Sequence, residues 1–332
     1  MPVLPYQGID AEYRDLFPDE EVLFSSLPKE EQYFRKTDVP FNDDDIVAIA
    51  NKEHEYTVSQ KNWVEREKKR MEVGVYAMIN GVLTFLPGSF YGYVNYWTLE
   101  NGETPEYRNC TRKIFILKEY LFFKTLVLAL TRGKSRRKGA TSEGTFWEWW
   151  VCGRNKEMNG GMISYSDESV KKIFSMLFMR GFKSMLPCFV EDFDSNSDNF
   201  IRFRKPVENK KKGVPIKREG LNSYIDSQPT TLNSYDSGRV SYLLGDEFGK
   251  WEKVDINVYW SKAKSTLTQG RKKVGFAYIP TTVNPLKKGG ENFKIFWDAA
   301  NQNAINKKTG LPYGINTPSR VVRIFDSAAE GY

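Results

Sequence analysis

Two adjacent carboxylates at the end of an apolar segment are the first residues in this sequence that could do chemistry. The run from Val240 to Leu244 is typical of a buried strand, and Asp246 and Glu247 follow it after one glycine. In a nucleotide hydrolase the first acid of such a pair holds Mg²⁺, directly or through water, and the second polarises the attacking water. An apolar strand that ends in a solvated acidic turn is the alternative, and the pair alone does not separate the two interpretations.

A basic, glycine-containing segment lies well upstream, between an apolar stretch and a predicted helix. It has five basic residues within Arg132–Lys138, followed directly by Gly139–Ser142. A glycine before a hydroxyl residue at a helix start allows backbone N–H groups to cradle a triphosphate while Thr141 reaches Mg²⁺. The segment departs from the pattern GxxxxGK[ST], because Ala140 stands where the lysine should be. A basic patch on nucleic acid is the alternative, but the order of this loop and the Asp-Glu pair favours nucleotide binding.

A third polar cluster follows another predicted strand. The segment from Val274 to Pro280 is apolar, and Thr281, Thr282, Val283 and Asn284 come directly after it. In additional-strand ATPases a polar residue at such a strand tip can sense the γ-phosphate. The two threonine hydroxyls and the asparagine amide are therefore candidates for contact with the γ-phosphate or its water, and a plain polar turn is the alternative.

The elements that must position these residues alternate between helices and strands after Thr111. This alternation predicts an α/β fold with a mainly parallel central sheet flanked by helices. Besides the two strands above, the expected elements are a helix over Thr111–Leu130 that can run into a strand, a helix over Gly139–Trp150, a strand over Gly161–Ser166, an amphipathic helix over Asp167–Leu186, and a long loop or ragged hairpin over Phe189–Gly220.

The chain before Thr111 has a different character. It is expected to contain an acidic arm over residues 1–58 with a short helix opened by Asp43–Asp45, a helix capped by Ser59, a hairpin of Val75–Ile79 and Val82–Leu86 around the Asn80-Gly81 turn, and an aromatic-rich strand over Phe90–Trp97. The hairpin is predicted because Asn-Gly readily adopts the positive φ angles of a type I′ turn.

Composition restricts the class of protein. The 332 residues are 40% hydrophobic and 27% charged, which is typical of a soluble globular chain with a sizeable core. Lys and Arg outnumber Asp and Glu by 49 to 42, yet residues 1–60 have 14 acids and 5 bases. A basic body behind an acidic leader indicates a phosphate-bearing partner.

Histidine and cysteine usage excludes several kinds of site. The single histidine, His54, excludes multi-histidine metal centres and is interpreted as a surface residue. Cys110, Cys152 and Cys188 lack a CxxC spacing, which argues against a disulfide framework or zinc site and predicts buried small side chains in a reducing compartment. Charges interrupt the apolar stretch Ile114–Thr131, and no signal peptide is evident, so a cytosolic protein without a membrane span is expected.

Taken together, the three ordered motifs resemble the ATPase domain of tailed-phage terminase large subunits, the motors that package DNA into procapsids. The phosphate loop of that family commonly reads Ser-Arg-x-x-Gly-Lys-Thr, which Ser135–Thr141 matches except at Ala140. Some members instead have a lysine at the loop start, as in Lys-Ser-x-Arg-x-Gly, which Lys134–Gly139 resembles closely. The resemblance implies that Lys134 is the phosphate-binding lysine, with Lys138 as its substitute.

The resemblance also implies roles for the other candidates. It implies a P-loop NTPase of the additional-strand, RecA-like type that binds ATP and Mg²⁺ and extends over roughly residues 75–332. The implied roles are nucleotide contacts from Lys134, Ser135, Lys138, Gly139, Ala140, Thr141 and Ser142; Mg²⁺ contacts from Asp246 and Thr141; a catalytic Glu247; an arginine finger at Arg136, with Arg137 as the other contender; and a coupling motif of Thr281, Thr282 and Asn284.

Weaker similarities lie outside the main motifs. The Asn80-Gly81 hairpin and Tyr93–Trp97 are similar to the segment before the phosphate loop in terminases of crAss-like phages, where it would form the adenine side of the site. Ser164–Ser169 resembles the strand-to-helix junction after the phosphate loop, and Ser234–Arg239 resembles the approach to the Asp-Glu strand.

The implied domain organisation is an acidic arm and helix over residues 1–74, an ATPase domain over 75–326, and the start of a linker at 327–332. Large terminases continue into an RNase H-like nuclease, so this chain is expected to be an ATPase fragment without a DNA-cutting centre. The implied partners are double-stranded DNA, a portal protein and a small terminase subunit, in a homo-oligomeric ring on the portal or as a monomer in solution, within the host cytoplasm. Lys210–Lys212, Lys262–Lys273 and Lys287-Lys288 are candidates for contacts with the DNA backbone.

Two other functions remain open from the sequence alone. One is a superfamily 2 helicase or DNA-repair ATPase, although such enzymes usually extend Asp-Glu into Asp-Glu-x-His or Asp-Glu-x-Asp, whereas Phe248 and Gly249 follow here. The other is a non-catalytic basic nucleic-acid-binding protein in which the loop and the acidic pair coincide by chance.

Overall fold

The computed structural model describes residues 39–79, 82–136, 138–205, 220–282, 284–286 and 290–326. Some predicted features lie outside these residues: most of the acidic arm, the Asn80-Gly81 turn, Arg137, Lys210–Lys212, Val283, Lys287-Lys288 and the linker at 327–332.

The described residues divide into two compact units. The first contains those up to Glu119 together with Arg180–Val190, and the second contains Tyr120–Met179 and those from Glu191 onward. This division differs from the boundary predicted after residue 74, and helices α4 and α5 on either side of that boundary contact each other within the first unit.

The first unit is mostly helical. Both of its early helices begin with a capping box, in which the cap and the third helical residue exchange side-chain and backbone hydrogen bonds. The first box confirms the helix predicted at Asp43–Asp45, but the cap of the second helix is Thr57 and not Ser59. The elements are α3 (Asp43–Ala50), α4 (Val58–Val73), β1 (Val75–Ile79), β2 (Val82–Leu86), α5 (Gly88–Tyr96), the first part of α6 (Asn109–Lys124) and η3 (Pro187–Phe189).

The aromatic segment after the hairpin is a helix, so the strand predicted over Phe90–Trp97 is wrong. Helix α5 begins after Pro87, and all nine of its residues are buried. Aromatic residues favour strands mainly through packing, and a helix that is surrounded by protein shows no polar face to reveal its period. The β1–β2 hairpin itself is confirmed, with Val75 opposite Leu86.

His54 and two of the cysteines differ from their predicted environments. The His54 side chain is 11% exposed and lies 3.6 Å from an Asp45 carboxylate oxygen, so it is not a surface residue. Cys152 is buried as predicted, whereas Cys110 and Cys188 are only half-buried. All three have free thiols.

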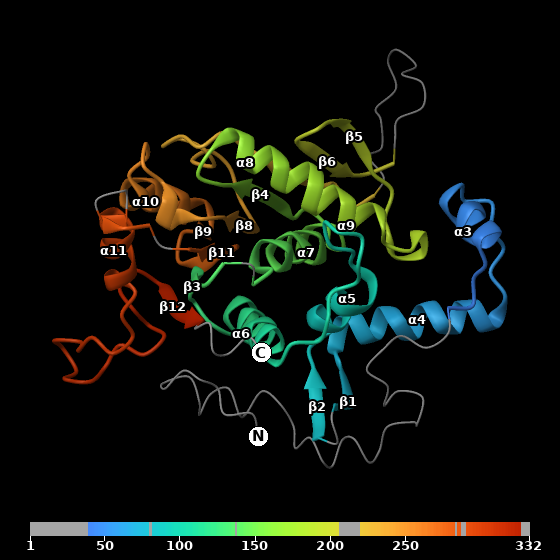
Figure 1. Ribbon diagram of the computed structural model, residues 1–332, viewed down its shortest axis with the longest axis horizontal. Coiled ribbons are helices and arrows are strands. Elements are labelled where there is room, and N and C mark those ends of the chain that lie inside the picture. The colour runs from blue at the N-terminus through green and yellow to red at the C-terminus, as the bar shows by residue number, and fades with distance from the viewer. Residues whose placement is uncertain are drawn as a thin grey trace. The chain divides into compact units, whose positions relative to one another are not determined.

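The second unit is built on one eight-stranded sheet in the order β12-β3-β11-β8-β4-β7-β6-β5 (Figure 1). The first six strands of that order run parallel to one another. Strand β6 pairs antiparallel with β7, and β5 pairs antiparallel with β6. The strands are β3 (Ala129–Lys134), β4 (Asn159–Ile163), β5 (Asp194–Ser197), β6 (Phe200–Phe203), β7 (Ser223–Ser227), β8 (Tyr242–Gly245), β11 (Phe276–Thr281) and β12 (Val321–Asp326), and a separate two-stranded ribbon joins β9 (Thr268–Gln269) to β10 (Lys272–Lys273).

The predicted α/β fold with a mainly parallel sheet is confirmed. Strand β11 lies between β3, which precedes the glycine loop, and β8, which carries the Asp-Glu pair. This insertion is the feature that defines the additional-strand type of P-loop fold. The β5–β6 pair also confirms the ragged hairpin expected after Phe189, because its register shifts between Asp194 and Ser197.

Helices cover both faces of the sheet. Helices α10 (Ile256–Thr266) and α11 (Gly290–Ala299) pack on one face, where Leu243 and Ala277 belong to the same core cluster. Helix α7 (Ala140–Cys152) packs on the other face, where Trp147 stacks on Tyr242 at 5.9 Å between ring centroids. Burial on both faces explains why β8 and β11 are continuous apolar runs.

The amphipathic helix predicted over Asp167–Leu186 is helical but not uniform. It consists of α8 (Asp167–Lys172), a π-helical turn η2 (Ile173–Phe178) and α9 (Met179–Lys183). A π-helical turn keeps the apolar positions on one side with a slightly different period, so the sequence pattern alone does not distinguish it from an α-helix. None of the described helices is both long and apolar enough to cross a membrane.

Candidate functional site

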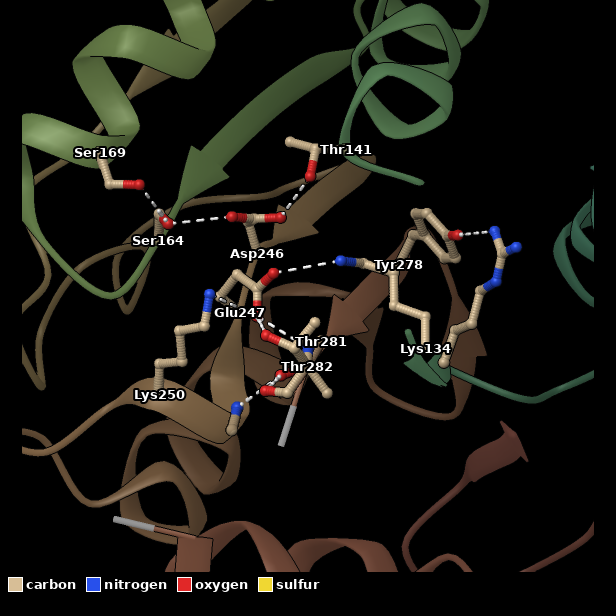
Figure 2. Close-up of polar contacts among 12 residues, drawn as sticks. Lys134, Thr141, Ser164, Ser169, Asp246, Glu247, Lys250, Tyr278, Thr281 and Thr282 are labelled. Atoms are coloured by element: carbon tan, nitrogen blue, oxygen red, sulfur yellow. Dashed lines mark hydrogen bonds and ion pairs between the residues drawn. The ribbon is translucent and has the colours of Figure 1, made fainter. Parts of the chain in front are cut away.

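The predicted chemical groups converge at one edge of the sheet in the second unit. Parallel strands place their carboxyl ends together, and β3, β8, β11 and β4 all end at this edge. Figure 2 shows the side chains that follow these tips, which come from Lys134, Asp246 with Glu247, Thr282 and Ser164.

The glycine loop connects β3 to α7. Gly139 is the residue before the helix and has φ +75°, a left-handed conformation that glycine adopts without strain. The backbone N–H of Glu143 donates to the Gly139 carbonyl and closes the first helical turn. Around this turn Ala140 and Ser142 are buried, Ser135, Lys138 and Thr141 are half-buried, and Arg136 is exposed.

Arg132 does not belong to the phosphate-facing cluster in which the sequence placed it. Its side chain is fully buried, and its Nη1 donates to the Glu143 Oε2 at 2.7 Å and to the Tyr278 hydroxyl at 3.1 Å. A buried guanidinium requires such partners, because isolated burial of its charge is very costly. Arg132 therefore fastens β3 to α7 beneath the loop.

Asp246 is held between the glycine loop and β4. Thr141 Oγ1 donates to its Oδ1 at 2.8 Å, and Ser164 Oγ donates to its Oδ2 at 3.1 Å. Burial and the adjacent charge of Glu247 raise the pKa of Asp246 to about 6, against the lowering effect of the hydrogen bond from Thr141. Above that pH the two carboxylates are both ionised, and a cation at this position would relieve their repulsion.

Glu247 lies in a dense set of donors. Lys134 Nζ lies 3.1 Å from its Oε1, and Lys250 Nζ lies 3.3 Å from its Oε2. The Thr282 backbone N–H and hydroxyl both donate to Oε2, each at 2.7 Å. Burial raises the pKa of Glu247, but Lys134, Thr282 and Lys250 outweigh burial and lower it below its ordinary value.

The backbone at Glu247 is itself unusual. This residue has φ +53° and ψ +42°, the left-handed region that non-glycine residues seldom adopt. Its N–H donates to the Pro280 carbonyl of β11 at 2.9 Å, which supports the conformation. Strained backbone of this kind clusters at functional sites.

The predicted coupling residues contact Glu247 and the turn that follows it. Thr282 binds the carboxylate, as described above, whereas Thr281 Oγ1 accepts a hydrogen bond from the Gly249 N–H at 2.8 Å. The Asn284 backbone N–H donates to the Gly249 carbonyl at 3.3 Å. The three residues thus link the tip of β11 to the segment that carries Glu247.

For three residues of this site the sequence predicted no role in contacting the two acids or in packing the glycine-loop helix. Ser164 and Lys250 contact the two acids, and Gly144 lets α7 approach β8, since a Cβ there would lie 2.5 Å from Leu244 Cδ1. Ser164 occupies the polar position directly after β4, which is the signal that marked the other strand tips.

The donor set fits a hard divalent cation. Thr141 and Asp246 offer a hydroxyl and a carboxylate, the oxygen ligands that Mg²⁺ prefers. Within the described residues no group of three or more His, Cys, Asp or Glu side chains gathers into a metal site. Such a cation would therefore need further oxygens from solvent or from a phosphate.

The predicted DNA-contacting stretch Lys262–Lys273 contains both exposed and half-buried basic side chains. Lys264, Arg271 and Lys272 are exposed, but Lys273 is not available for a DNA contact. Its Nζ donates to the Leu121 carbonyl at 2.6 Å and lies 5.0 Å from the Phe276 ring centroid, and burial lowers its pKa to about 7.

No protein-family model matches the sequence, and no curated protein matches it. Several solved structures do match. The HK97 bacteriophage large terminase has 12% sequence identity and a TM-score of 0.47, with 72% of this chain and 43% of that chain covered. A large terminase from a thermophilic bacteriophage has 10% identity and a TM-score of 0.44, with 68% and 47% covered. The large terminase ATPase domain of Thermus phage P74-26 has 13% identity and a TM-score of 0.41, with 61% and 77% covered. The chain is thus similar in structure to ATPase domains of phage large terminases.

Proposed function

We propose that this chain hydrolyses ATP and uses the energy to translocate double-stranded DNA into a viral procapsid, as the ATPase domain of a terminase large subunit. The observation that carries the proposal is the convergence of Lys134, Asp246 and Glu247 at one sheet edge, on two strands that are separated by β11. A coincidental basic loop and acidic turn would have no reason to meet in this way.

The roles follow from the chemistry of each group. Lys134 and the backbone of the glycine loop bind the phosphates of ATP, and Thr141 with Asp246 holds Mg²⁺. When bound, Mg²⁺ offsets negative charge on the phosphate oxygens. Glu247 accepts a proton from the attacking water, since its carboxylate lies at the same edge and is kept ionised by its donors. Arg136 or Arg137 offsets charge on the γ-phosphate.

Binding of Mg²⁺-ATP tests this proposal directly. Lys134→Ala should weaken binding about 10- to 100-fold, because a charged hydrogen bond contributes roughly 1.5–3 kcal/mol. Asp246→Ala should remove the dependence of binding on Mg²⁺. The measurement is fluorescent-nucleotide titration with and without Mg²⁺, and Lys264→Ala on α10 is the matched control. Binding that ignores both substitutions would refute the nucleotide site.

DNA binding supplies a second test. We expect affinity for duplex DNA to fall steeply as salt rises, because backbone contacts release counterions from the DNA. Replacing Lys264 and Arg271 by Ala should reduce the log–log salt slope by about 2 and weaken unrelated duplexes equally. Titrations of two unrelated duplexes over a salt series measure both effects. Affinity that did not change with salt would refute backbone contact, and DNA binding without ATP binding would favour a non-catalytic nucleic-acid-binding protein.

The cellular setting follows from the proposed activity. The motor would act in the host cytoplasm, as a homo-oligomeric ring docked transiently on the portal of a procapsid, with DNA delivered by a small terminase subunit. The crAss-like resemblance of the segment around Tyr93–Trp97 stays a prediction.

A further inference from the structure

Glu247 is bound by two lysines that approach from opposite sides. Figure 2 shows Lys134 reaching the carboxylate from the end of β3 and Lys250 reaching it from the turn after Glu247. The contacts divide between the two oxygens, because Oε1 faces Lys134, whereas Oε2 accepts from Thr282 and pairs with Lys250.

Only one of the two lysine contacts, that of Lys134, should change during the proposed reaction. A Lys134 ammonium that engages the phosphates of ATP divides its three N–H donors and its charge between the phosphates and Oε1, so its hold on Oε1 weakens. The contacts on Oε2 come from Thr282 and Lys250 and involve neither Lys134 nor the glycine loop, so they can persist. Oε1 would then be the oxygen that is freed toward the glycine loop.

Lys250 is well placed to remain. It ends the short turn η4 (Phe248–Lys250), and its backbone N–H donates to the Glu247 carbonyl at 2.8 Å. Its side chain is 27% exposed, and its Nζ also lies 5.6 Å from the centroid of the Tyr165 ring. The hydrogen bond from Gly249 to Thr281 fixes the same turn to β11.

We infer that Lys250 is a positioning residue for hydrolysis, which rests on the function proposed above. It holds Oε2 of Glu247 while Lys134 engages the phosphates, and it thereby keeps Oε1 turned toward the attacking water. Thr282 alone would hold Oε2 through two uncharged donors, whereas the Lys250 ammonium adds the attraction of a full positive charge to the same oxygen.

The test compares Lys250→Met with the parent chain in steady-state ATP hydrolysis. We expect kcat to fall about 10- to 100-fold, the scale of a misplaced catalytic group, with KM and the dissociation constant for fluorescent ATP unchanged. Lys250→Arg should restore most of kcat, because it restores a cation at Oε2. Lys253→Met is the matched control, because Lys253 is exposed and lines a cavity of about 690 Å³ together with Lys250. The Lys253→Met variant should hydrolyse ATP normally.

The outcomes separate this inference from the proposed function. A normal or raised kcat in Lys250→Met, in a protein that Glu247→Gln inactivates, would overturn the role of Lys250 alone. Equal losses of kcat in Lys250→Met and Lys250→Arg, or a lowered melting temperature that accounts for the loss, would also overturn it. Full turnover in Glu247→Gln would overturn both the catalytic assignment and the inference.

Discussion

Glu247→Gln is expected to lower kcat for ATP by about 10²- to 10⁴-fold, the usual contribution of a general base, while ATP still binds. Glutamine has the shape of glutamate but cannot accept the proton of the attacking water. Its carbonyl oxygen can still accept the two hydrogen bonds from Thr282 that now go to Oε2. The backbone conformation at residue 247 should therefore survive the substitution.

Glu247→Gln should not weaken the binding of ATP. In the parent chain Lys134 is paired with the Glu247 carboxylate, which therefore competes with a phosphate for the charge of Lys134. The neutral amide of glutamine removes that competition, so ATP should bind at least as tightly as it does to the parent chain. Single-turnover hydrolysis and nucleotide titration on the same preparation measure the two effects separately.

A neighbouring acid provides the control for this experiment. Glu252 is exposed and lies five residues further along the same segment, so Glu252→Gln changes the net charge equally at a residue with no assigned role in hydrolysis. It should leave both kcat and affinity unchanged. Full turnover in Glu247→Gln would remove Glu247 from the mechanism, and loss of binding in that variant would indicate a structural role.

The sequence predicts those parts of the fold in which the pattern of apolar and polar residues along a segment matches the burial of that segment in the folded protein. Strands β8 and β11 are apolar because both of their faces are covered, and each ends in polar residues at the same sheet edge. Because parallel strands end at the same edge of a sheet, the sequence indicates that these polar tips lie on one side of the molecule's sheet. The strand predicted over Phe90–Trp97 was wrong because α5 is buried on every side, and burial alone does not reveal the period.

The contacts that the sequence does not predict depend on side chains brought together by tertiary structure. Lys250 follows Glu247 by three residues, but only the left-handed backbone at Glu247 and the turn after it bring the two charges together. Ser164 reaches Asp246 because β4 is the neighbour of β8 in the sheet, which the order of segments along the chain does not specify.

Arg132 is a residue that the sequence groups with the basic loop although its side chain is buried beneath it. Its substitution should have a large effect on stability. Arg132→Met is expected to lower the free energy of unfolding by about 3–5 kcal/mol, because it breaks the buried ion pair between Arg132 and Glu143 by removing one partner. Its position two residues before Lys134 places it in the basic run of the sequence, yet its side chain is buried and bound by Glu143 of α7 and Tyr278 of β11. Chemical denaturation of the parent and the variant measures the loss.

A double substitution distinguishes this structural role from a role in nucleotide binding. Arg132→Met combined with Glu143→Leu should recover much of the lost stability, because apolar pairs of similar volume often replace a buried ion pair without cost. If Arg132 instead contacted phosphate, the single variant would unfold normally but bind ATP weakly, and the second substitution would not help. Since the Tyr278 hydroxyl contacts both Arg132 and Glu143, Tyr278→Phe should cost less stability than Arg132→Met, because it leaves the charged pair intact.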